Sequence, residues 1–243
     1  MWFGHQPKIR AWRTILVCYI YCRPCFSGAV SLQHNSDAAN PERNAWDRDY
    51  RQRGRLWGGA KRIIPDLPAG SRVLEIGCGN GKTLAAMLHQ PWQTVALDIS
   101  SRAAEIAMSD SRGFADVLVA DACQLPFKDD SFDAVLAFHI TGHLLSDGRR
   151  LMASESARVL RPGGKLFFRD FGADDMRSGQ GREVEPKTYK RGEGILTHYF
   201  TEKEAVKLFS MLRPESIRTH AWKMRIRGQD LLRSEIEACL NRD

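Results

Sequence analysis

Short apolar runs recur between residues 71 and 171, and several of them end in an acidic side chain. Val73–Ile76, Thr94–Asp98, Val117–Ala122 and Phe132–Phe138 are apolar enough to be strands buried on both faces. A Pro-Gly-Gly turn leads into a fifth run within Arg161–Phe171, and polar helical segments separate the runs. This alternation predicts an α/β fold built on a doubly wound, Rossmann-like sheet.

The first apolar run leads directly into three alternating glycines. Gly77, Gly79 and Gly81 lack a Cβ, so the backbone there can turn sharply and approach a ligand closely. The spacing is G-x-G-x-G, whereas dinucleotide-binding enzymes use G-x-G-x-x-G. Glu75 precedes the first glycine by two residues. A carboxylate in this place favours a cationic group over a pyrophosphate, so the loop predicts a nucleotide-like ligand with a cationic part.

Two further acids close the next two runs. Asp98 stands where a doubly wound fold puts the carboxylate that accepts both ribose hydroxyls, and Asp121 can accept a hydrogen bond from the exocyclic amine of adenine. The carboxyl ends of parallel strands meet beside the topological switch point. We therefore expect Glu75, Asp98 and Asp121 to converge on one site.

With these motifs, residues Asn44 to the C-terminus resemble the class I S-adenosylmethionine-dependent methyltransferases. E-x-G-x-G-x-G is followed in the family's order by the acid of the second strand, by D-A-x-x-L-P-F from Asp121 and by L-R-P-G-G from Leu160. The resemblance implies a seven-stranded sheet, mostly parallel, with an antiparallel C-terminal strand. It also implies that S-adenosylmethionine is the cofactor and that it is held by Glu75, Gly77, Cys78, Gly79, Gly81, Asp98, Ile99, Asp121, Ala122 and Phe138.

Two further features resemble the tRNA 3-methylcytidine methyltransferases and their archaeal and bacterial relatives. One is W-D-R-D-Y ahead of the glycine loop, and the other is F-F-R-D-F-G followed by Y-K-R-G-E-G-I-L-T-H-Y-F-T from Tyr189 to Thr201. The second implies a hairpin insertion at about residues 173–200. The resemblance implies RNA, including tRNA, as the methyl acceptor, and a small metabolite stays open as the other acceptor class.

The segment Asn44–Gly59 has two interpretations. Trp46 and Tyr50 are one helical turn apart, so an amphipathic helix could simply pack on the sheet edge. In related methyltransferases this segment is a lid over the cofactor. A lid would place the two rings against the sulfonium and would let Arg55 pair with the cofactor carboxylate.

The residues after the fourth and fifth strands are candidates for the acceptor side. His139 or His143 could accept a proton near neutral pH, and we assign His139 as the candidate base and His143 as a candidate substrate contact. Arg169 and Asp170 could contact the substrate or form an internal ion pair that holds the insertion. The segment Gln229–Leu240 fits either a strand or a helix.

Composition is that of an ordinary globular domain with a basic surplus. The 243 residues are 43% hydrophobic and 27% charged, with a net charge of +7. This surplus is compatible with RNA, although a moderately basic surface is usually only solvated charge. We divide the chain into an extension at 1–43, disordered or extraneous, and a methyltransferase domain at 44–243.

The extension carries an apolar run, Thr14–Tyr21, that imitates a secretory signal but is too short to cross a bilayer. Its Cys18, Cys22 and Cys25 have the spacing of a radical-enzyme iron–sulfur site, but a methyltransferase sheet follows, and we predict no metal. We expect a reducing, cytoplasmic location, no membrane association, and a monomer or dimer that could have a protein partner. Two functions stay open: a methyltransferase, or a cofactor-binding subunit without turnover.

Overall fold

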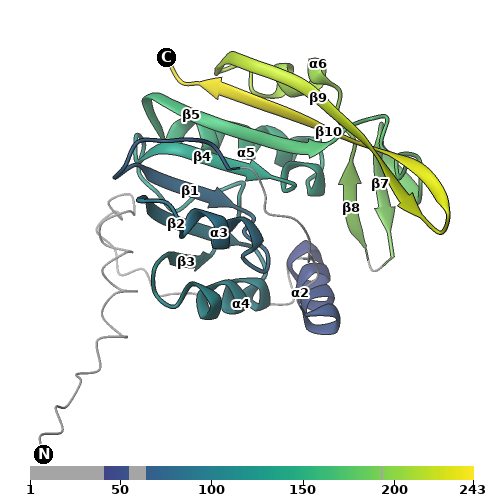
Figure 1. Cartoon of the computed structure of the whole chain (residues 1–243), viewed down its shortest axis with the longest axis horizontal. Helices are drawn as coiled ribbons and strands as arrows, with labels where there is room; N and C mark the ends of the chain where they lie inside the picture. Colours follow the sequence, from purple (N-terminus) through teal and green to yellow (C-terminus); the bar gives the residue numbers. More distant parts are fainter. Residues whose placement is uncertain (1–40, 55–63, 193) are drawn as a thin grey trace, which may run out of the picture.

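Seven strands form one twisted sheet in the order β3-β2-β1-β4-β5-β10-β9 (Figure 1). The structure is a computed structural model that describes residues 41–54, 64–192 and 194–243. The strands are β1 (Arg72–Ile76), β2 (Gln93–Asp98), β3 (Asp116–Val119), β4 (Phe132–Phe138), β5 (Leu160–Phe171), β9 (Arg213–Ile226) and β10 (Gln229–Asn241).

The five strands β1 to β5 are parallel, and β10 runs antiparallel to both of its neighbours, β5 and β9. This confirms the predicted α/β sheet with an antiparallel C-terminal strand. The segment Gln229–Leu240, for which a helix was also open, is a strand. Its alternate residues Ser234, Ile236, Ala238 and Leu240 are buried, which is the period of two that a half-buried strand requires.

Helices cover both faces of the sheet. On one face α5 (Ser146–Val159) and α6 (Glu202–Leu208) share a core with Leu74 and Ile76 of β1. On the other face α3 (Lys82–Met87) and α4 (Ser101–Ser111) pack on Val73 and Ala96. Because neighbouring strand residues point to opposite faces, the apolar runs must be apolar at every position, which is the pattern that the sequence shows.

An insertion after β5 forms a small second sheet of β6 (Arg182–Glu185), β7 (Thr188–Arg191) and β8 (Ile195–His198). A short connection joins the end of β7 at Arg191 to the start of β8 at Ile195. The helix α2 (Pro41–Arg53) begins three residues before the boundary that we predicted at residue 44. Figure 1 shows α2 and the small sheet at the same end of the large sheet, where β1 and β4 point. Among the described residues, none of the helices has the length and apolar character needed to span a bilayer.

Candidate functional site

A cavity of about 390 Å³ lies at the carboxyl ends of the parallel strands, between α2 and the insertion. Most of the predicted site residues meet in its wall. Those that line it are Trp46, Tyr50, Glu75, Gly77, Cys78, Gly79, Asp98, Ile99, Phe138, His139 and His143.

The glycine loop packs closely against the side chains of Ile140 and Tyr50 in the cavity wall. Gly77 and Gly79 have φ values of 74° and 53°, a left-handed region that glycine adopts without strain. A Cβ on Gly77 would lie 2.8 Å from a carbon of Ile140, and one on Gly79 would lie 2.6 Å from the Tyr50 hydroxyl. The loop therefore depends on glycine at both positions, and Tyr50 of α2 packs directly over it.

Asp98 is the most highly organised acid of the site. Its Oδ2 accepts a hydrogen bond from the Gly79 amide at 2.8 Å, and its Oδ1 accepts one from the Ser100 amide at 2.9 Å. Burial raises the pKa of Asp98 to about 6, although both amides act to lower it. A side chain at the end of β2 thus fixes the glycine loop that follows β1 and keeps oxygen lone pairs for a ligand.

The helix α2 is attached to the domain through a second buried acid, Asp47. The Ser100 hydroxyl donates to its Oδ1 at 2.5 Å, and the Arg102 amide donates to the same oxygen at 3.2 Å. Asp47 therefore binds the first turn of α4, where unpaired amides and the helix dipole favour a carboxylate. This attachment places Trp46 and Tyr50 over the cavity, with their ring centroids 5.9 Å apart.

A second, much smaller cavity holds the predicted adenine-side residues. Asp121, Ala122 and Ile99 line it, and Trp46 and His143 lie between the two cavities because they line both. The strand β3 ends at Val119, so Asp121 lies two residues beyond the strand rather than at its end. One Asp121 oxygen accepts from the Cys123 amide at 2.8 Å, which orients the carboxylate.

The two histidines have different surroundings. His139 follows β4 in a left-handed conformation, with φ of 56°, and its ring stacks on Phe171 at 4.6 Å. Its Nε2 lies 3.3 Å from Glu235 Oε1 and its Nδ1 lies 3.9 Å from Asp170 Oδ1. The short helix η1 (Thr141–His143) carries His143, whose Nδ1 lies 2.6 Å from the Leu196 carbonyl oxygen.

Three predicted residues do not line either cavity. Gly81 caps the start of α3 instead. Arg169 is bound to Glu237 at 2.8 Å and covers the Phe138 ring at 4.6 Å, and Asp170 accepts hydrogen bonds from the Gly142 and Phe171 amides. Arg169 and Asp170 therefore make internal contacts at the end of β5. These contacts are with other partners, and within the described part of the chain the internal ion pair between Arg169 and Asp170 that we considered is not present. Arg55, Cys18, Cys22 and Cys25 lie outside the described residues.

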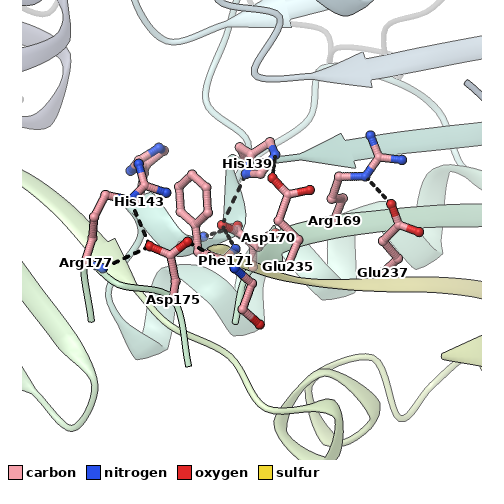
Figure 2. Close-up of polar contacts among 12 residues, drawn as sticks. His139, His143, Arg169, Asp170, Phe171, Asp175, Arg177, Glu235 and Glu237 are labelled. Atoms are coloured by element: carbon pink, nitrogen blue, oxygen red, sulfur yellow. Dashed lines mark hydrogen bonds and ion pairs between the residues drawn. The ribbon is translucent and has the colours of Figure 1, made fainter. Parts of the chain in front are cut away.

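The insertion contributes wall residues that sequence reasoning missed. Arg177, Arg191 and Tyr199 line the main cavity, as does Phe171 at the end of β5. The Arg177 guanidinium lies 4.0 Å from the Phe171 ring centroid on the side opposite His139 (Figure 2). Residues 173–194 are mostly polar, and a polar segment is expected to lie on the surface. The sequence therefore did not indicate that two arginines of this segment, Arg177 and Arg191, line the cavity.

Cys78 lies in the loop but is not a reactive thiol. It is 5% exposed, and burial followed by the neighbouring Asp98 raises its pKa well above the usual range. A thiol that stays protonated is a poor nucleophile. Its role in the wall is packing beneath the ligand space.

Comparisons with known proteins agree with the fold. Residues 74–168 match the family described as "Methyltransferase domain". Among solved structures, a SAM-dependent methyltransferase from Methanosarcina mazei has a TM-score of 0.62 at 24% identity, covering 72% of this chain and 94% of that one. A Haloferax volcanii complex of the Trm112 methyltransferase activator with a methyltransferase also gives 0.62, at 21% identity over 83% of this chain and 97% of that one.

Curated relatives match over a shorter share of their own length. The tRNA N(3)-cytidine methyltransferase METTL2 of Gallus gallus is 28% identical over 167 residues, which is 62% of this chain and 45% of that protein. The Drosophila melanogaster tRNA N(3)-methylcytidine methyltransferase Mettl2 is 34% identical, over 54% of this chain and 45% of its own. This chain thus spans less than half of either relative. The expected resemblance to class I methyltransferases is confirmed.

The attachment of α2 through Asp47 generates a first testable prediction. Asp47→Ala should lower the free energy of unfolding by about 1–3 kcal/mol, because the buried Ser100 hydroxyl and the Arg102 amide lose their acceptor. Urea denaturation measures this loss. Gln52→Ala is the matched control, since Gln52 is exposed on the same helix. Equal stabilities of the two variants would show that Asp47 does not anchor α2.

Proposed function

We propose that this chain, which carries a class I S-adenosylmethionine-dependent methyltransferase domain, binds S-adenosylmethionine and transfers its methyl group to an RNA acceptor. The observation that carries the proposal is the buried Asp98 carboxylate joined to the Gly79 amide at the edge of the cavity. A charged oxygen acceptor beside a glycine loop, at the switch point of a parallel sheet, is the arrangement that holds a ribose diol.

The residues present fit this cofactor. The Asp98 oxygens accept the Gly79 and Ser100 amides, and a carboxylate has acceptor sites beyond these two for a ribose hydroxyl. Asp121 and Ile99 border the small cavity on the same side of the sheet, where adenine would find an acceptor and an apolar surface. Glu75 is 3% exposed in the wall, and it is the acid that the resemblance assigns to the methionine ammonium.

When bound, the cofactor supplies a methyl group already activated by its sulfonium. The protein has then mainly to align the acceptor and to keep water away from the site. The rings of Trp46 and Tyr50 suit this task because they cover the cavity from α2. An aromatic face also attracts a cation such as a sulfonium.

An RNA acceptor is supported by the matched relatives, whose names describe tRNA methyltransferases. The hairpin of β9 and β10 adds basic residues on an exposed surface; they include Arg213, Arg218, Lys223, Arg225 and Arg227. Such a surface suits a polyanion. A small-molecule acceptor is the alternative, and a cofactor-binding subunit without turnover is the second. A protein partner, the oligomeric state and the cytoplasmic location stay predictions.

The role of Asp98 can be tested through the pH dependence of binding. Below about pH 6 the Asp98 carboxyl takes up a proton and loses both its charge and one acceptor site, so affinity for S-adenosylhomocysteine should fall as pH is lowered from 7.5 to 5. Asp98→Asn should weaken binding at pH 7.5 by about 1–3 kcal/mol and remove this dependence. Calorimetry at several pH values measures both effects. Unchanged affinity in the variant would remove Asp98 from the ribose site.

The lid interpretation of α2 gives a separate prediction. Trp46→Ala should keep the ligand-free melting temperature but gain less from added cofactor, because the ring covers the ligand rather than the core. The expected loss of affinity is about 1–3 kcal/mol. Trp222→Ala on β9, outside both cavities, is the control. A Trp46 variant that melts early and shows the full ligand-induced shift would make α2 a structural helix only.

The acceptor class requires a transfer assay. Purified protein with tritium-labelled methyl donor should label a fraction of total RNA from the source organism and leave a metabolite extract unlabelled. Label in small molecules alone would select the other acceptor class. Binding of the cofactor without transfer to either pool would favour the non-catalytic subunit.

A further inference from the structure

The half of the main cavity away from the glycine loop has the properties of an acceptor site. Its wall comes from the segment that follows β4, from η1, from the end of β5 and from the insertion. The residues on this side are His139, His143, Phe171, Arg177, Arg191, Ile195, Thr197 and Tyr199. It contains two candidate proton acceptors, His139 and His143, and the polar groups around each ring distinguish them.

The hydrogen bond of His143 fixes its tautomer. A carbonyl oxygen can only accept, so the Nδ1 that lies 2.6 Å from the Leu196 oxygen carries the hydrogen. In the neutral ring the lone pair is then on Nε2. Within the described residues Nε2 makes no hydrogen bond and is not among the buried atoms without a partner, so it is accessible from the cavity that His143 lines.

His139 is surrounded differently. Its two ring nitrogens both face carboxylates: Nε2 lies 3.3 Å from Glu235 Oε1, and Nδ1 lies 3.9 Å from Asp170 Oδ1. Nδ1 is buried and has no hydrogen-bond partner in the described structure, and Nε2 is occupied by the Glu235 contact. A substrate in the cavity cannot reach the buried Nδ1. The base that we first assigned from sequence is therefore the less suitable histidine.

His143 also has the better position. It is one of five residues that line both the main cavity and the small adenine-side cavity; the others are Trp46, Gly77, Ile99 and Ile140. Trp46 packs edge-on against its ring at 4.8 Å and limits its rotation. His143 is thus held next to the cofactor side of the cavity, with its accessible nitrogen fixed in direction.

We propose that Nε2 of His143 accepts a hydrogen bond from an N–H of the methyl acceptor and takes that proton during transfer. This inference rests on the proposed methyltransferase function. The lone pair of the acceptor nitrogen forms a bond to the methyl carbon. At the same time the carbon–sulfur bond breaks, and the electron pair of that bond stays on sulfur. The methylated acceptor group loses one N–H proton to Nε2 of His143, and the electrons of that N–H bond stay on nitrogen. Nε2 then releases the proton to solvent.

The charges around His143 suit a base that starts neutral and gives up its proton again. Burial lowers the pKa of His143, while Asp170 and the Leu196 carbonyl act to raise it. His139 and Arg177 act to lower it further. The ring is therefore unprotonated near neutral pH, and the imidazolium that forms during transfer is unstable enough to lose its proton.

The wall beside this base can hold a planar, oxygen-bearing acceptor. Arg177 donates from Nε to Asp175 Oδ1 at 2.9 Å and lies over Phe171, so its guanidinium is fixed (Figure 2). Arg191 binds the Arg177 carbonyl and the Tyr199 hydroxyl. The wall thus combines cations with aromatic rings, which suits a heteroaromatic ring that also carries an oxygen acceptor.

The test combines NMR with kinetics. Nitrogen-15 spectra of histidine-labelled protein should show a neutral His143 with its hydrogen on Nδ1 at pH 7. The methyl-transfer rate of wild-type protein, measured as kcat at saturating S-adenosylmethionine so that the Asp98 effect on affinity is removed, should fall as pH is lowered through the His143 titration. His143→Gln should lower kcat by about 100-fold, remove this acidic limb and leave the affinity for S-adenosylhomocysteine within twofold. His89→Gln, an exposed histidine outside the cavities, is the control.

Each result has a defined meaning. A His143→Gln variant that keeps the wild-type rate and the acidic limb would overturn the inference while the methyltransferase function stands. Loss of the limb in His139→Gln instead would assign the base to His139. A His143 hydrogen on Nε2 would also overturn it, whatever the activity. Wild-type protein that methylates neither RNA nor metabolites would overturn the proposed function, and this inference with it.

Discussion

The arrangement of the site depends on one buried polar junction at the end of β2. Asp98 receives the Gly79 amide and the Ser100 amide, and the Ser100 side chain in turn donates to Asp47. Three segments are joined in this way: the glycine loop, the start of α4 and the helix α2. Burial makes each bond more important, because a donor or acceptor that lost its partner here could not exchange it for water. The junction therefore fixes the cofactor side of the cavity as one unit.

Sequence was sufficient for the parts whose signal is local. Continuous apolar runs predict buried parallel strands. Asp98 could be predicted as a ligand-binding residue because it is an acid at the carboxyl end of such a strand, where doubly wound folds bind their ligands. The glycine loop could be predicted from its spacing. The structure gives the physical reason for the glycines: Ile140 and Tyr50 leave no room for a Cβ at Gly77 and Gly79. The bounds of β4 are those predicted, whereas β3 ends two residues before Asp121.

The parts that sequence did not reveal depend on distant partners. Asp47 and Ser100 are separated by 53 residues, and Asp175 and Arg233 by 58, so no local pattern connects them. The choice of strand for Gln229–Asn241 follows from pairing with β5, which alternation alone could not establish. The two histidines illustrate the same limit. Their types and spacing are equal evidence for a base, and only the carbonyl of Leu196 and the carboxylate of Glu235 tell them apart.

The side of the cavity formed by the insertion has its own buried polar junction. The two halves of the cavity are therefore organised by different groups. Asp175 has a fully buried side chain and binds both Arg177 and Arg233, which joins the insertion to β10. Although burial opposes ionisation, these arginines hold the pKa of Asp175 below its usual value, so the carboxylate stays charged. Asp98 organises the cofactor half without contact to this junction. A change in the insertion can therefore alter the acceptor wall while the glycine loop keeps its shape. His143 is the exception, because its ring contacts Trp46 from the cofactor half and its Nδ1 binds β8 of the insertion. In the function proposed above, a residue held from both halves could couple the position of α2 to the docking of an acceptor.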